Sequence, residues 1–300
     1  MKALRLAIIL FFPVTVLHAQ NDLLGELNKL DSNTTVPVEA TFKSTRIING
    51  HSVETVKKNH MDFRISHRFG RLNSGSYQLY GLDQATLRLG FEYGLTDDLM
   101  IGVGRSTEQK AFDFFAKYRL LKQTSGAKVI PVSVTLFASS AIRTLRPVSD
   151  EEIPRTFQNK LTYVYQALIA RKFSEKLSLQ ITPTYLYRNL PELTGEERGL
   201  FSLGLGGRLK ISKRVSVNAE YFWTARNNSS LPYHDSMALG VDIDTGGHVF
   251  QLHFTNSLGM IEKQFIGETT GSWGKGDVHY GFNISRTFSF DKKARGKVNY

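Results

Sequence analysis

The chain has 300 residues, no cysteine and a formal net charge of +11, from 38 basic and 27 acidic side chains. Without cysteine there is no disulfide framework, so an exported form of this chain must be stabilised by burial or by closure of a sheet. The basic residues are spread along the sequence and form no concentrated patch, so we expect no nucleic-acid partner.

Residues 1–19 have the pattern of a cleavable signal peptide. Two basic residues precede an apolar run from Leu6 to Leu17, and Leu17-His18-Ala19 approximates a small-residue cleavage site. The run is shorter than the roughly 20 apolar residues that a membrane-spanning helix needs. We expect export and a mature chain that begins near Gln20, with an uncleaved anchor as the weaker alternative.

Residues 20–59 differ from the rest of the chain. A short helix is expected over Asn21–Leu30, and STRIINGHSVETVKKNH has no apolar face that matches a barrel wall. It does contain Ile47-Ile48, which a disordered linker would lack. We interpret residues 20–59 as a periplasmic or lumen-inserted segment that could also dock a periplasmic partner. Residues 38–48 could instead form one more strand.

From residue 60 onward, apolar and polar residues alternate, as in a strand with two unlike faces. In MDFRISHRF, Met61, Phe63, Ile65 and Phe69 share one face. Similar segments recur up to residues 277–290, and counting backward from that segment gives twelve strands. A strand at residues 38–48 would make the number odd.

The turns support this count. Leu95-TDD-Leu99, Phe173-SEK-Leu177 and Ile211-SKR-Val215 each set an apolar residue on both sides of a three-residue loop. Gly246-Gly247 is interpreted as a two-residue hairpin turn with Ile243 opposite Phe250, because a phosphate-binding loop would need a helix after the glycines. We expect positive φ at both glycines.

Short turns near 96–98, 122–127, 174–176, 212–214 and 246–247 alternate with longer loops, among them 256–276. This alternation is typical of an outer-membrane β-barrel with short periplasmic turns and longer extracellular loops. The sequence therefore predicts an all-β fold: a transmembrane antiparallel up-and-down barrel of about twelve strands over residues 60–290, with a polar tail at 291–300. The competing fold is a secreted β-sandwich. Aromatic residues near strand ends favour the barrel: Tyr93, Tyr118, Tyr185, Tyr187, Tyr221, Trp223, Phe288 and Phe290.

Several blocks of the sequence, including ATFKSTRIINGHSVE and DIDTGGHVFQLHFTNSLGMIEKQFIGETTGSWGKGDVHYGFNISRTF, resemble an uncharacterised Bacteroidota family of β-barrel proteins, known only as a domain of unknown function. The resemblance covers nearly the whole mature chain. It implies an outer-membrane location in a Gram-negative bacterium, and it brings no activity, substrate or site residues with it.

The candidate functional residues face the lumen of such a barrel. A mild excess of inward basic residues would favour anions; the alternative is that inward charges pair and fill the lumen, with Phe115 and Phe222 also turned inward. The basic residues proposed for selectivity are Arg64, Arg68, Arg88, Lys117, Arg119, Arg188 and Arg208.

Two histidines form the most specific candidate for a metal or proton site. If Thr255 faces Asp277 across the last loop, His253 and His279 lie opposite each other near the outer mouth, where they could bind a metal ion or a proton together with Asp277. A metal site normally needs more ligands, so solvated histidines are the favoured interpretation. Trp273, in the same loop, is interpreted as an interface anchor or, less readily, a ligand contact.

The sequence contains none of the common hydrolase or phosphate-binding motifs, so we expect no catalytic residues, cofactor or resident metal. The favoured function is a porin-like, passive or weakly anion-selective pore for small solutes, in contact with outer-membrane lipid and inserted by the outer-membrane assembly machinery. A non-conducting structural or partner-binding barrel is the first alternative, and a membrane-embedded hydrolase is the second.

Overall fold

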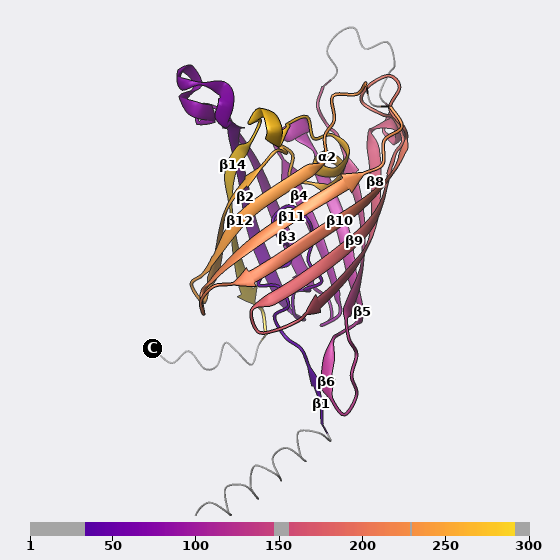
Figure 1. The fold of residues 1–300 in the computed structure, drawn as a ribbon. Coiled ribbons are helices and arrows are strands. Elements are labelled where there is room, and N and C mark those ends of the chain that lie inside the picture. Colours follow the sequence, from indigo (N-terminus) through magenta and orange to yellow (C-terminus); the bar gives the residue numbers. More distant parts are fainter. Residues whose placement is uncertain (1–33, 147–155, 229, 292–300) are drawn as a thin grey trace, which may run out of the picture.

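Twelve antiparallel strands form a closed barrel in the computed structural model, which describes residues 34–146, 156–228 and 230–291 (Figure 1). The strands are β2 (His60–Arg71), β3 (Ala85–Gly94), β4 (Leu99–Ser106), β5 (Phe112–Leu121), β7 (Ser133–Ile142), β8 (Leu161–Lys172), β9 (Leu177–Arg188), β10 (Gly199–Lys210), β11 (Val215–Thr224), β12 (Ser236–Asp244), β13 (His248–Thr255) and β14 (His279–Ser289). The expected signal peptide at 1–19, the expected helix at Asn21–Leu30 and the tail from residue 292 lie outside the described residues.

Each barrel strand pairs with its neighbours in the chain, and the first and last barrel strands close the sheet. Ile284 of β14 lies opposite Ile65 of β2. Because closure leaves no unpaired edge, every strand of the wall has a hydrogen-bonded partner on both sides. The prediction of a twelve-stranded up-and-down barrel is confirmed.

The two faces of the wall differ as the alternation predicted. In β9, Leu177, Leu179 and Ile181 are exposed on the outside, while Gln180 and Thr182 are buried inside. An apolar outer face is stable only against lipid or another apolar surface, whereas polar inward groups need internal hydrogen-bond partners.

The turns divide the barrel into two ends. The short-turn end has the connections 95–98, 122–132, 173–176, 211–214 and 245–247, and the long-loop end has the others. The backbone N–H of Leu95 donates to Leu99 O at 2.9 Å, and equivalent bonds close the turns at Phe173 and Ile211, so the three-residue loops are confirmed.

The glycine hairpin has the predicted register, but the backbone conformation of one glycine differs from the prediction. Ile243 pairs with Phe250, and Thr245 N–H donates to His248 O at 3.0 Å, which makes Gly246-Gly247 a two-residue turn. Only Gly246 has a positive φ, of 87°, so the expectation of positive φ at both glycines was wrong. One positive φ at the first position is the requirement of a type II′ turn.

The connection after β5 is longer than predicted. Residues 122–132 extend beyond the barrel, and β6 (Thr124–Gly126) pairs with β1 (Thr35–Pro37) in a small separate sheet below the wall (Figure 1). This pairing holds the chain at the short-turn end before it turns into the barrel.

Short helical segments lie in the loops at the long-loop end. They are η1 (Leu72–Ser74), η2 (Ser76–Gly81), η3 (Glu108–Lys110), η4 (Gln158–Lys160), α2 (Glu262–Gly267) and η5 (Trp273–Lys275). No helix in the described part of the chain is long and apolar enough to span a membrane.

Candidate functional site: the occupied lumen

The lumen contains a hairpin-like loop formed by residues 40–58, here called the inserted segment. The chain comes from β1 at the short-turn end, reverses at residues 47–50 and returns to Lys58, which bridges to Gly94. Ile47 N–H donates to Gly50 O at 2.8 Å, and Arg46 and His51 bridge the two arms.

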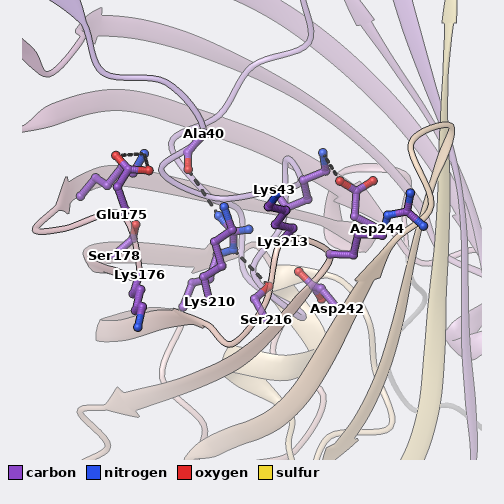
Figure 2. Close-up of a pocket in the computed structure, with 13 residues that line it drawn as sticks. Ala40, Lys43, Glu175, Lys176, Ser178, Lys210, Lys213, Ser216, Asp242 and Asp244 are labelled. Atoms are coloured by element: carbon purple, nitrogen blue, oxygen red, sulfur yellow. Dashed lines mark hydrogen bonds and ion pairs between the residues drawn. The ribbon is translucent and has the colours of Figure 1, made fainter. Parts of the chain in front are cut away.

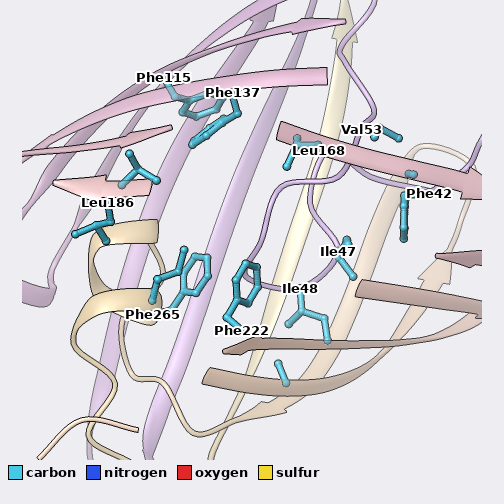
Figure 3. Packing of buried hydrophobic residues seen from close by; sticks show 14 of the residues in the cluster. Phe42, Ile47, Ile48, Val53, Phe115, Phe137, Leu168, Leu186, Phe222 and Phe265 are labelled. Carbon is cyan, nitrogen blue, oxygen red and sulfur yellow. The ribbon is translucent and has the colours of Figure 1, made fainter. Parts of the chain in front are cut away.

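Apolar side chains of the inserted segment make it part of the protein core. Phe42, Ile47, Ile48 and Val53 are each no more than 3% exposed. Figure 3 shows them among inward side chains of the wall and of α2, including Phe222 and Phe265. Segments that fill a barrel in this way exclude water from it, which explains why Ile47-Ile48 occur in an otherwise polar stretch.

The tip of the inserted segment is anchored by Glu220 of β11. The backbone N–H groups of Ile48, Asn49 and Gly50 donate to its carboxyl oxygens at 3.2, 2.8 and 3.1 Å. Three consecutive N–H groups of a reversing chain have no secondary-structure partners, so one carboxyl group satisfies donors that would otherwise be buried without acceptors.

Lys117 of β5 binds both arms of the hairpin. Its Nζ donates to Thr45 O at 3.3 Å, to Ser52 O at 2.7 Å and to Glu54 O at 2.5 Å. Three acceptors satisfy all three ammonium protons of a fully buried lysine.

Uncharged wall residues complete the binding of the inserted segment. Gln180 accepts from Val53 N–H at 2.9 Å and donates to His51 O at 2.7 Å, while Gln251 donates to Ile47 O at 2.5 Å. Sequence reasoning missed these residues and Glu220 as ligands of the inserted segment. The sequence did show that these polar side chains face inward, but the alternation of apolar and polar residues does not predict which groups they bind.

The seven basic residues singled out from the sequence face inward, but they do not line one open ring. Several bind the inserted segment: Arg64 donates to Ser44, Arg68 to Asn49 Oδ1 at 2.6 Å, and Arg119 to Thr55. Lys117 belongs to the same group.

Of the other three, Arg88 and Arg188 pair with acidic residues, and Arg208 contacts the start of the inserted segment. Arg88 pairs with Asp113 on the wall, with 3.0 Å between Nε and Oδ1. Arg188 pairs with Glu196 of a long loop at 2.7 Å, and Arg208 lies at the short-turn end, where it donates to Ala40 O at 3.3 Å.

The last long loop fills the lumen from the opposite end. Residues 256–269 were expected to lie outside the barrel, but they fold inward as far as α2, where Phe265 and Ile266 are fully buried. The apolar residues in GMIEKQFIGE are the sequence signal, since an exposed loop would not need them. The expectation of an extended outer loop here was wrong.

The inserted segment and residues 256–269 contact each other inside the lumen at Glu262 of α2. Its Oε1 lies 3.3 Å from Arg46 Nη1 and 3.6 Å from His51 Nε2. The next residue of the helix, Lys263, contacts Gln109 at 2.6 Å and Glu268 at 2.9 Å through its Nζ. An ion pair therefore connects the inserted segment to α2, and a hydrogen bond connects α2 to the loop that contains Gln109.

The histidine pair differs from the sequence interpretation. His279 pairs with Thr255 and His253 with Gly281, so the two histidines are not opposite each other, and the expected pairing of Thr255 with Asp277 was wrong. Residues 276–278 belong to the turn that follows η5, which shifts the register by two.

The three proposed mouth residues have separate surroundings. Both histidines are buried, so the expectation of solvated histidines was wrong, and His279 Nδ1 lies 2.9 Å from Phe69 O. Asp277 instead binds Arg71 and Asn73 in the loop region. Hydrogen bonds from the Asn73 side chain and the Ser272 N–H lower the pKa of Asp277. The described residues contain no cluster of three or more histidine, cysteine or carboxylate side chains that could hold a metal ion.

Trp273 lies in η5 and is partly buried. Its indole N–H donates to Met237 O at 3.1 Å, which fixes the last loop against the end of β12. The contact anchors the loop to the wall, and the interpretation of Trp273 as a membrane-interface anchor stays a prediction.

A cavity of about 130 Å³ lies at the short-turn end, between the inserted segment and the ends of β8–β12 (Figure 2). Ala40 and Lys43 contribute from the inserted segment, and the wall and turns contribute the rest. Seven basic and three acidic residues line it: Lys43, Lys172, Lys176, Arg208, Lys210, Lys213, Arg214, Glu175, Asp242 and Asp244.

Comparison with known families gives one match. The profile of a family described as a membrane bound beta barrel domain (DUF5777) matches residues 42–288, which includes most of the inserted segment and nearly all of the wall. No curated protein matches the chain.

Solved structures of other barrels are similar at low identity. The NanC porin is 11% identical with a TM-score of 0.49, and the alignment covers 77% of this chain and 99% of that one. The KdgM porin is 10% identical with a TM-score of 0.44 and the same coverage. The translocator domain of the autotransporter NalP from Neisseria meningitidis is 13% identical with a TM-score of 0.35, over 92% of this chain and 98% of that one. The fold is therefore established by the strand pairing of the chain itself.

Proposed function

This chain belongs to the family of membrane bound beta barrel domains, and we propose that it is an outer-membrane channel for small solutes that its own N-terminal segment holds closed. The observation that carries the proposal is the bonding of inward wall residues. Glu220, Lys117 and Gln180 have the backbone of the inserted segment as their partner.

The width of the barrel is consistent with an inserted segment that acts as a removable plug. About eight strands enclose a space that wall side chains alone can fill, and wider barrels leave room for a channel or a plug. Here the inserted segment occupies that room, and hydrogen bonds and packing, with one short bridge at Gly94, attach it to the wall. It can leave toward the short-turn end without breaking any strand pairing of the barrel, which supports its role as the part that moves.

The apolar outer face, the family description and the expected signal peptide support an outer-membrane location with the short-turn end in the periplasm. We assign no enzymatic activity. Departure of the inserted segment would free Arg64, Arg68 and Lys117 from their partners in that segment, although Arg64 would keep its ion pair with Asp62 on the wall, and this supports a weak preference for anions. Arg88 would contribute less because Asp113 neutralises it in the wall.

A non-conducting, partner-binding barrel is the second candidate. The observation in its favour is that residues 256–269 also fill the lumen and are held at both ends by the wall. In that case the inserted segment and the small sheet of β1 and β6 would serve as a docking element at the short-turn end.

Single-channel conductance in planar bilayers tests the proposal. We expect the mature protein to conduct rarely and a variant lacking residues 20–59 to conduct stably. A disulfide lock gives the matched control: a Cβ built at Gly206 would lie 3.7 Å from Ile47 Cγ1, so an Ile47→Cys/Gly206→Cys pair would bring the two sulfur atoms close together. The chain has no other cysteine to interfere.

The oxidised lock should abolish rare openings, and reduction should restore them. If the deletion variant folds but stays silent, also after residues 258–268 are replaced by a short linker, the channel proposal is refuted and the partner-binding barrel takes its place. An anion preference that survives neutralisation of Arg64, Arg68 and Lys117 together would refute the assignment of selectivity to these residues.

A further inference from the structure

The cavity at the short-turn end differs from the rest of the lumen because much of its charge has no partner. The acidic residues are occupied: Lys43 Nζ lies 2.6 Å from Asp244, Lys172 Nζ lies 3.2 Å from Glu175, and Gln251 donates to Asp242 at 2.6 Å. In contrast, the side chains of Lys210 and Lys213 form no hydrogen bond or ion pair with any residue that the structure describes, while Arg214 interacts electrostatically with Asp244.

The geometry points to a binding site for a phosphate group or a similar multivalent oxyanion, formed jointly by the inserted segment and the wall. A volume of about 130 Å³ holds an ion of this size with a few waters, given that a water occupies about 30 Å³ of liquid. Uncompensated cations around a concave, partly enclosed space raise the local concentration of anions.

Arg208 and two serines line the part of the site that the wall forms, and hydrogen bonds hold Arg208 in place. Arg208 Nε donates to Ser216 Oγ at 3.1 Å and Nη1 donates to Ala40 O at 3.3 Å, so the guanidinium group is held while its second terminal nitrogen is free for a ligand. Ser216 and Ser178 are buried in the wall beneath it and supply hydroxyl donors. Charge-assisted hydrogen bonds to oxyanions are the strong class of such bonds, and arginine provides them in fixed geometry.

Binding at this site would also strengthen the closed state. Lys43 belongs to the inserted segment, whereas Lys210 and Lys213 belong to the wall and its turn (Figure 2). Arg208 belongs to β10 of the wall. An anion between them binds more tightly when the segment is in place, and a ligand that binds one state more tightly stabilises that state. The site itself does not require that the barrel conducts.

Calorimetric titration of the full mature protein in non-ionic detergent with pyrophosphate tests the proposal. We expect saturable binding that Lys210→Gln/Lys213→Gln weakens about tenfold or more, since it removes two charged contacts. The control Lys122→Gln/Lys128→Gln removes two charges at the same end, in the connection 122–132 and outside the cavity, and should change the affinity less than about twofold. Equal weakening in both double variants would show general charge attraction and overturn the site.

Two further measurements complete the test. Pyrophosphate should slow hydrogen exchange of residues 40–56 in the wild type and not in Lys43→Gln; slowing in both would overturn the joint site. If pyrophosphate does not bind, hydrogen exchange of residues 40–56 is compared between the same variants in phosphatidylcholine vesicles with and without phosphatidylglycerol. A difference confined to vesicles with the anionic lipid assigns the oxyanion to a lipid headgroup, and no difference in either medium refutes the site.

Discussion

Replacing Glu220 by alanine removes the acceptor for three consecutive N–H groups at the tip of the inserted segment, which donate at 2.8–3.2 Å. A hydrogen bond to a charged group contributes about 1.5–3 kcal/mol. The three bonds share one acceptor, and the free segment can hydrogen-bond to water. We therefore expect a loss of about 3–5 kcal/mol in the free energy that holds the segment in the lumen.

Hydrogen exchange followed by mass spectrometry measures this loss directly. A change of about 3 kcal/mol raises the population of the open segment by more than a hundredfold, so residues 45–56 should lose protection by a similar factor. The barrel strands should keep theirs, because their ladder does not involve the segment. Gln166→Ala is the matched control: Gln166 is also a buried inward residue, but it donates to Thr184 on the wall.

Unchanged protection of residues 45–56 in Glu220→Ala, with the barrel intact, would refute the view that this carboxyl group anchors the segment. Loss of protection throughout the barrel would show instead that the segment and the wall unfold as one unit. In that case the proposal of a removable plug would also fail.

Three further predictions concern the wall and the last loop. Gly94→Ala places a Cβ 2.1 Å from a backbone carbonyl oxygen of the returning arm, so exchange of residues 53–58 should rise by the equivalent of about 1–3 kcal/mol, whereas Gly247→Ala, with open space around it, should have no such effect. Asp113→Asn leaves Arg88 buried without its ion pair and should destabilise the barrel by about 3–5 kcal/mol, seen as a lower melting temperature; an unchanged melting temperature would contradict the assignment. The pKa of Asp277 is lowered from its ordinary value of 3.8 by its hydrogen bonds, so its stabilisation of the last loop is present at neutral pH and is lost as the pH falls through the lowered value; limited proteolysis of residues 270–278 between pH 5 and 2 (roughly the window of that loss) should show an acid-induced increase that Asp277→Asn lacks.

Much of the wall could be predicted from the sequence. Alternation of apolar and polar residues has a period of two, so it reports which face each residue occupies in a strand. Matching apolar residues around three-residue loops, as at Leu95 and Leu99, then fix the register of neighbouring strands. These relations are local, and the strand number, the hairpin at Gly246-Gly247 and the inward direction of Arg64 and Lys117 all follow from them.

The partners of the inward residues could not be predicted in this way. Glu220 and the N–H of Asn49 are 171 residues apart, and Arg46 and Glu262 are 216 apart. The periodicity of a strand shows that its side chain points inward, but it does not show what lies there. The sequence therefore left an open pore and a filled lumen as alternatives.

By itself, the sequence determined a twelve-stranded barrel with an apolar outer face, because each strand encodes its two faces within a few residues. Only the tertiary structure decided that the lumen is occupied, that residues 40–58 and 256–269 meet inside it, and that the two histidines are not opposite each other. The physical reason is that buried polar groups must find acceptors and donors wherever the closed chain brings them, and those contacts are set by the three-dimensional path of the chain.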